Sequence, residues 1–124
     1  MTGRVVHFEV PYDEADRAET FYAEVFGWSL RPVPDMPYTQ VTTGPSDQGV
    51  PGEAGFINGG MLARAGEVRG PVLTIDVDDI DAVLAAVESR GGTTVAAKEA
   101  VGALGFSAYF RDPEGNLMGL WQGP

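Results

Sequence analysis

Val5-Val6-His7-Phe8-Glu9-Val10 is a stretch that the chain repeats in altered form as Val72-Leu73-Thr74-Ile75-Asp76-Val77. Both stretches are apolar except at the third and fifth positions, carry an acid at the fifth position and end on valine. Such a pattern predicts a β-strand with two different faces. Because it occurs twice, the sequence indicates two related structural modules.

The same order of elements follows both stretches. Asp13 is predicted to cap a first helix that Gly27 ends, and Asp78 or Asp79 to cap a second helix that Gly91-Gly92 ends. The apolar stripes of these helices are Ala18, Phe21, Tyr22 and Val25 in the first and Ile80, Val83, Leu84 and Val87 in the second.

Short β-like runs separated by turn residues complete each half. They are residues 28–33, 38–43 and 54–62 in the first half and residues 93–101, 106–111 and 117–122 in the second. The chain is therefore predicted to be α+β and to run βαβββ twice. We expect a single domain over residues 1–124, with module one at about 4–62 and module two at about 71–122.

Two segments between the runs are rich in turn residues. Asp112-Pro113-Glu114-Gly115-Asn116 predicts a hairpin turn, because proline presets φ and Gly115 can adopt a positive φ. Residues 44–52 contain so many glycines and prolines that no regular structure is expected there. This loop is either a mobile flap or an ordinary solvated connection.

Composition excludes several classes of protein. With 124 residues, 44% of them hydrophobic, the chain can bury a core of its own. A formal charge of −10 repels nucleic acids and anionic membranes, so neither is expected as a partner. No cysteine is present, the N-terminal residues do not resemble a signal peptide, and no run is long and apolar enough to span a membrane. A cytoplasmic location is expected.

The chain contains one histidine, His7. Metal sites that need two or more histidines therefore cannot form within one chain. A Ser-His-Asp arrangement would have to use His7 itself, and no Gly-x-Ser-x-Gly motif is present to position a serine.

Several motifs together resemble the vicinal oxygen chelate superfamily of glyoxalases, bleomycin-resistance proteins and extradiol dioxygenases. They are the βαβββ repeat, Phe21-Tyr22-x-x-Val25-Phe26-Gly27-Trp28, Val77-Asp78-Asp79-Ile80-Asp81 and Asp112-Pro113-Glu114-Gly115-Asn116-Leu117. The ending Gly119-Leu120-Trp121-Gln122 is most similar to small bacterial glyoxalase-like proteins. The resemblance implies two modules that curl a mixed sheet into half-barrels around a cleft, and a homodimer.

The resemblance also implies where a metal would bind. In metal-using members the ligands are His, Gln or Glu on the first and last strands of each module. The corresponding places here are Val5, Val72, Gly119 and the segment Asn58 to Gly60, and none offers a strong ligand. No cofactor is therefore expected. A divalent metal stays an open alternative, held by a displaced site of His7, Glu9 and Asp76.

Strand alternation predicts which side chains line the cleft. Val6, Phe8 and Val10 should face the helices, which leaves His7 and Glu9 on the concave side. We predict His7 and Glu9 as an acid–base pair, with a purely structural, hydrogen-bonded His7 as the alternative. The predicted ligand-binding residues are Phe56, Asn58, Thr74, Asp76, Tyr109 and Trp121.

Three functions are compatible with these patterns. The leading interpretation is a protein that binds a small organic molecule in an aromatic-lined cleft without the family's metal. The first alternative is a metal-dependent lyase or isomerase of the glyoxalase type. The second is a dimeric scaffold without catalytic activity. Whether the protein is an enzyme is left open by the sequence.

Overall fold

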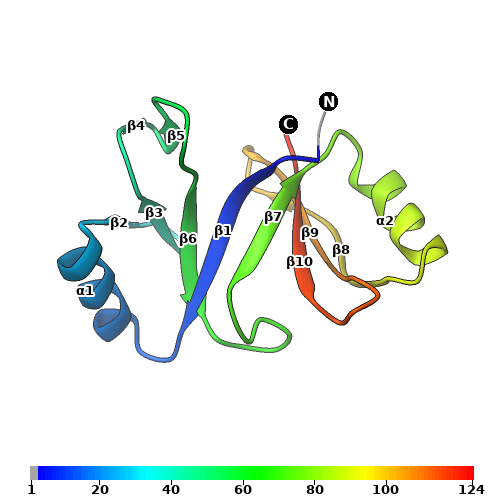
Figure 1. The fold of residues 1–124 in the computed structure, drawn as a ribbon, viewed down its shortest axis with the longest axis horizontal. Helices are drawn as coiled ribbons and strands as arrows, with labels where there is room; N and C mark the ends of the chain where they lie inside the picture. Colours follow the sequence, from blue (N-terminus) through cyan, green and yellow to red (C-terminus); the bar gives the residue numbers. More distant parts are fainter. Residues whose placement is uncertain (1–2) are drawn as a thin grey trace. The chain divides into compact units, whose positions relative to one another are not determined.

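The computed structural model describes residues 3–124 and divides them into two units. The N-terminal unit is His7–Pro71, and the C-terminal unit is Val72–Pro124 together with the residues up to Val6. Each unit has one helix and its own set of neighbouring strands (Figure 1).

The elements follow the predicted order. The first half has β1 (Val5–Tyr12), α1 (Ala15–Phe26), β2 (Ser29–Pro32), β3 (Thr39–Thr42), β4 (Ser46–Asp47), β5 (Val50–Pro51) and β6 (Asn58–Ala63). The second half has β7 (Val72–Asp76), α2 (Ile80–Ser89), β8 (Thr93–Val101), β9 (Gly105–Arg111) and β10 (Leu117–Gln122). The predicted α+β chain that runs βαβββ twice is confirmed, with the small β4–β5 ribbon as an addition.

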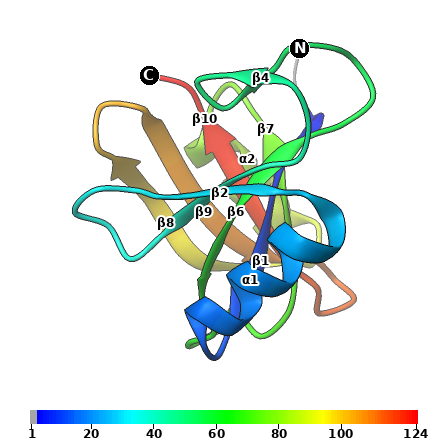
Figure 2. The same ribbon diagram turned by 90° about the vertical axis from the view of Figure 1, so that its left-hand side faces the viewer.

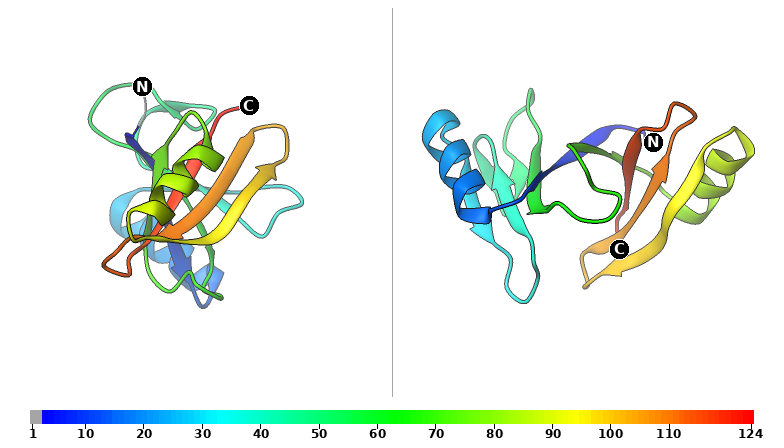
Figure 3. Two further views of the ribbon diagram at one scale, coloured as in Figure 1. Left: turned by 90° about the vertical axis from the view of Figure 1, so that its right-hand side faces the viewer. Right: turned by 90° about the horizontal axis from the view of Figure 1, so that it is seen from below.

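Both units use the same strand arrangement. The order is β2-β3-β6-β1 in the N-terminal unit and β7-β10-β9-β8 in the C-terminal unit. In each unit the first strand of the module runs parallel to the last one, and the other pairs are antiparallel. The helix joins the first and second strands, which lie at opposite ends of this order and run in the same direction, so it is a crossover connection. Figure 2 shows this for α1, and the left panel of Figure 3 shows α2 against the sheet of its own unit.

The start of α1 differs from the prediction. Glu14, not Asp13, is the N-cap, and its side chain makes no capping hydrogen bond. Both acids are engaged with arginines instead: Glu14 pairs with Arg17 at 2.7 Å and Asp13 with Arg64 at 3.1 Å. The end is as predicted, because Gly27 adopts the left-handed conformation with φ 74° that a glycine C-cap favours.

The two helices are buried to different degrees. In α2, Ile80 and Leu84 are buried in a core cluster with Val77, Ala108, Phe110 and Leu120, and the side chain of Asp79 accepts a capping hydrogen bond from the Ala82 N–H. No residue of α1 is fully buried. Of its predicted stripe, Phe21 is 52% and Val25 is 56% exposed, and the adjoining Phe26 is 60% exposed.

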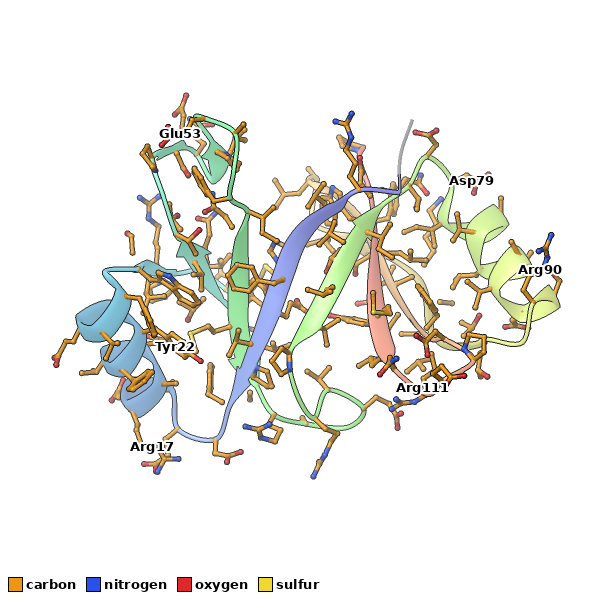
Figure 4. All side chains as sticks on the ribbon, viewed as in Figure 1. Arg17, Tyr22, Glu53, Asp79, Arg90 and Arg111 are labelled. Atoms are coloured by element: carbon orange, nitrogen blue, oxygen red, sulfur yellow. The ribbon has the colours of Figure 1, made fainter. Side chains whose placement is uncertain are left out.

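Tyr22 carries the contact between α1 and the strands of its unit. Its ring stacks on Trp28 with centroids 4.7 Å apart, and Trp28 lies 5.6 Å from the ring of Phe8 on β1. Figure 4 shows Tyr22 on the strand-facing side of α1. Phe8 therefore points toward the helix, as the alternation of β1 predicts.

The loop at residues 44–52 is more regular than predicted. Ser46–Asp47 and Val50–Pro51 form a two-stranded antiparallel ribbon, and the turn between them is Gln48-Gly49. Both turn residues have positive φ, 50° and 83°, which is the signature of the tight hairpin turn that matches strand twist. The expectation of no regular structure was wrong because glycine there forms the turn of a hairpin rather than breaking structure.

The second predicted turn is confirmed. β9 and β10 pair as a hairpin with Arg111 opposite Leu117, and Gly115 has φ 84°. The carboxylate of Asp112 accepts hydrogen bonds from the backbone N–H groups of Glu114 and Asn116 and from the Asn116 side chain. These bonds lower the pKa of Asp112.

Neither helix within residues 3–124 has the length and apolar character that crossing a membrane requires.

Candidate functional site

Three polar side chains form a hydrogen-bond chain on the face of β1 that points away from α1. The phenol oxygen of Tyr38, just before β3, lies 2.7 Å from Nε2 of His7 and 2.9 Å from Oε2 of Glu9. His7 and Glu9 share this face because they are two residues apart on one strand. The structure thus joins the predicted acid–base pair through a third residue.

Glycines make room for this arrangement. Gly60 lies opposite Glu9 on β6, and a Cβ placed there would lie 2.0 Å from the phenol oxygen of Tyr38. Gly59 makes room for the ring of Phe8 on the other face of the sheet, where a Cβ would lie 2.7 Å from that ring. The pairing of β6 with β1 and β3 runs through both glycines without a register shift.

The three hydrogen-bonded side chains are partly shielded from solvent. Glu9 is 7% exposed and His7 is part-buried. Burial lowers the pKa of His7 from its ordinary value of 6.5, and the charge of Glu9 opposes this by raising it. Since burial is the larger effect, His7 is neutral at pH 7 and can accept a proton or donate a hydrogen bond.

Asn58, one of the predicted ligand-binding residues, is hydrogen-bonded within its own unit. It lies opposite His7 on β6, but its amide is engaged by the loop that follows β3. Nδ2 donates to Ser46 Oγ at 2.8 Å and to the Gly49 carbonyl at 3.0 Å, while Oδ1 accepts from the Thr43 N–H at 2.8 Å. Asn58 therefore fastens the β4–β5 ribbon to the sheet.

Phe56 lies in the same loop region. It precedes β6 and belongs to no strand, unlike the predicted run 54–62. Its ring fills the space beside Gly44, where a Cβ would lie 2.7 Å away. Phe56 thus packs within the loop, and its described contact is with Gly44 rather than with His7.

The other predicted ligand-binding residues lie together in the C-terminal unit. Strand pairing places Gly119 between Thr74 and Tyr109, and Trp121 next to Asp76. Residues opposite one another in a ladder project from the same face of the sheet, so these four side chains share one face. The opposite face carries the core residues Ala108, Phe110 and Leu120 that pack against α2.

Similarity to known proteins agrees with this architecture. Residues 4–44 match a family model described as "Bleomycin resistance protein-like N-terminal". A "Glyoxylase-like domain-containing protein" of Didymella fabae is 27% identical over 129 residues, which cover 100% of this chain and 97% of the relative. A solved structure of methylmalonyl-CoA epimerase superposes with a TM-score of 0.68 at 20% identity and covers 100% of this chain and 98% of that one.

The chain therefore shares the fold of these proteins, and its N-terminal third matches the bleomycin-resistance-like family model. A further relative, "Putative glyoxylase CFP32" of Mycobacterium tuberculosis (strain CDC 1551 / Oshkosh), is 33% identical over 111 residues. The match covers 85% of this chain but 40% of that relative, so the chain spans well under half of its length. The resemblance inferred from sequence motifs is confirmed, and so is the fold that it implies.

The residues present do not fit the metal that the vicinal oxygen chelate superfamily implies. Val72 is a buried aliphatic side chain, and a Cβ at Gly119 would lie 2.8 Å from Thr74 Oγ1, so a longer ligand there would have to displace Thr74. The two real donors, His7 and Glu9, both bond the Tyr38 phenol. Between residues 3 and 124, no three His, Asp or Glu side chains are grouped so that they could hold an ion.

Tyr38 is the site residue that the sequence did not reveal. It lies 31 residues from His7 and 29 from Glu9 in the chain, and no local pattern connects them. The one available signal was Gly60, because a glycine in the middle of a strand marks a place where another group approaches closely.

Proposed function

We propose that this protein binds a small organic molecule beside the His7–Tyr38–Glu9 chain and does so without the superfamily's metal. The supporting observation is the position of the Tyr38 phenol oxygen, within hydrogen-bond distance of both the His7 ring and the Glu9 carboxylate. A metal ion that used these two residues would have to displace the phenol from both hydrogen bonds. Three neighbouring polar groups joined by hydrogen bonds are instead typical of a site that orients an organic ligand.

The C-terminal unit has an aromatic face of its own. Trp121 and Tyr109 flank the strand positions around Gly119 on the face opposite the core. Aromatic side chains bury large areas of a flat ligand and still present polar edges. This face of the C-terminal unit, taken by itself, is suited to a ligand with an aromatic or conjugated group, so such compounds belong among the first probes.

Metal analysis is the first test. We expect the protein, purified without chelators, to contain no stoichiometric divalent ion. Adding nickel, zinc, manganese or iron(II) should leave its melting temperature unchanged, because a ligand stabilises only the state that binds it. An ion present at a hundredfold excess over its Kd would add about 2.7 kcal/mol to the free energy of unfolding, which is a shift of several degrees and easily measured.

His7→Ala is the matched variant for this test. A stoichiometric ion whose effect on melting disappears in His7→Ala would contradict the proposal and support a glyoxalase-type metal-dependent lyase. With no metal effect, the same melting assay should find a saturable ligand among small aromatic compounds, with metal-free bleomycin as the first probe. If neither metals nor a broad metabolite collection shift the melting temperature, the scaffold interpretation replaces the binder.

A further inference from the structure

The hydrogen-bond chain determines where the protons lie. A phenol carries one proton, and that of Tyr38 is donated to Oε2 of Glu9. The same phenol oxygen lies 2.7 Å from Nε2 of His7 and has no second proton to offer. Nε2 must therefore carry the hydrogen and donate it to Tyr38, which leaves Nδ1 of the neutral ring without a proton.

Nδ1 also keeps some exposed surface. The ring of His7 has no hydrogen bond beyond the one to Tyr38 in the part of the chain that the structure describes. Every fully buried side-chain nitrogen or oxygen between residues 3 and 124 has a hydrogen-bond partner. Because Nδ1 has none, it cannot be fully buried. A histidine with a purely structural role would be expected to use both ring nitrogens.

We propose that Nδ1 of His7 is the proton acceptor for a hydroxyl or N–H group of the bound molecule, with Tyr38 and Glu9 as positioning residues. This inference rests on the proposed function and specifies its ligand as a hydrogen-bond donor. Tyr38 holds the ring in one tautomer, and Glu9 holds Tyr38, which is the arrangement of a base oriented by a third group. If the ligand transfers its proton to Nδ1, the resulting imidazolium is stabilised through Tyr38 by the carboxylate of Glu9.

The single histidine makes the tautomer measurable without assignment. In protein labelled with ¹⁵N-histidine, the two ring nitrogens of His7 give the only imidazole signals. At pH 7.5 we expect one protonated nitrogen, identified as Nε2 by its couplings to the ring carbons' hydrogens, and an Nδ1 with the shift of a bare lone pair. A hydrogen on Nδ1 would overturn the inference, because Tyr38 would then be donating to His7.

Two tyrosine variants separate positioning from general effects. Tyr38→Phe removes the phenol, so the second tautomer should become populated and the His7 signals should broaden or split. Tyr12→Phe makes the same change at the end of β1, the strand that carries His7. Tyr12 lies on the opposite face of β1 from His7, so this variant should leave the signals unchanged. Equal spectra for Tyr38→Phe and the unmodified protein would contradict the positioning role.

Accessibility of Nδ1 is tested with diethyl pyrocarbonate, which transfers an ethoxycarbonyl group to a bare imidazole nitrogen and releases ethanol and carbon dioxide. We expect modification of His7 at Nδ1, located by the same ¹⁵N spectrum. An unmodified His7, or modification at Nε2, would overturn the inference. Neither measurement involves a metal, so this inference and the metal-free proposal can fail separately.

Discussion

The ionisation of His7, the single histidine of the site, is determined by two opposing effects. Burial lowers its pKa and the charge of Glu9 raises it. Alternation along β1 was sufficient to predict that His7 and Glu9 share a face, because the period of a strand is two residues. It could not predict Tyr38, whose approach depends on how β3 pairs with β6.

Glu9→Gln should lower the pKa of His7 further. The substitution keeps the shape of the side chain and removes the charge that favours imidazolium, so only the effect of burial is left. The pKa is measured from the ring proton shifts of the single histidine between pH 4 and pH 8. A pKa that rises in Glu9→Gln would show that Glu9 does not act on His7 through its charge.

The lowered pKa also fixes the sign of a stability change. The unfolded chain protonates His7 near its ordinary pKa of 6.5, whereas the folded chain does so only at lower pH. Between these two values the unfolded state binds more protons, so the free energy of unfolding falls as the pH falls. Above the ordinary pKa both states are neutral at His7, and this residue contributes no pH dependence.

At the scale of the elements, two adjacent glycines decide how β6 is packed. The sequence could not show that each glycine faces a different ring, because the two rings come from other strands or loops. A Cβ at Gly59 would lie 2.3 Å from the backbone oxygen of Phe8, whereas at Gly60 the obstacle is the side chain of Tyr38. Backbone can shift less easily than the end of a side chain.

Gly60→Ala should therefore lower the free energy of unfolding by about 1–3 kcal/mol, as overpacking does. Gly59→Ala should lower the free energy of unfolding more than Gly60→Ala does. Nothing lies within 4 Å of a Cβ at Gly70, so Gly70→Ala should change the free energy of unfolding by no more than about 0.5 kcal/mol. Urea unfolding of the three variants measures these differences. If Gly59→Ala and Gly70→Ala were equally stable, the close packing at β6 would be refuted.

The helices illustrate what periodicity can and cannot predict. The apolar stripes of α1 and α2 were both visible in the sequence, and both helices form where expected. Only α2 buries its stripe. Periodicity identifies the apolar face of a helix, but what covers that face depends on the rest of the fold or on a partner.

At the scale of the whole molecule, the fold was predictable and the ligand was not. The repeated strand, the helix ends and the Asp112–Asn116 turn are local patterns, and together they specify the order of elements. A binding site depends on side chains brought together from distant positions, such as Tyr38 and His7. Function therefore follows from the site rather than from the fold.

The oligomeric state is a property of the whole molecule that stays a prediction. Exposed Phe21, Val25 and Phe26 on α1 form the kind of apolar surface that partners cover, and we expect a homodimer. Two copies that each carry a charge of −10 repel one another, so the dimer should strengthen as salt is raised from low to physiological concentration. Sedimentation equilibrium measures this, and a monomer at every concentration and salt level would contradict it.

The hydrogen bonds of the Asn58 amide to residues 43–49 have a consequence for the chemical ageing of the protein. Asn58 is followed by Gly59, the dipeptide in which an asparagine most readily cyclises and deamidates. Here the amide is buried, and the strand has neighbours on both sides, which hinders that reaction while the protein is folded. If aspartate formed at this position, its carboxylate would have no hydrogen to donate to the Gly49 carbonyl. The β4–β5 ribbon would then lose a hydrogen bond that holds it to β6. Old preparations would thus lose the order of this loop before they lose the fold.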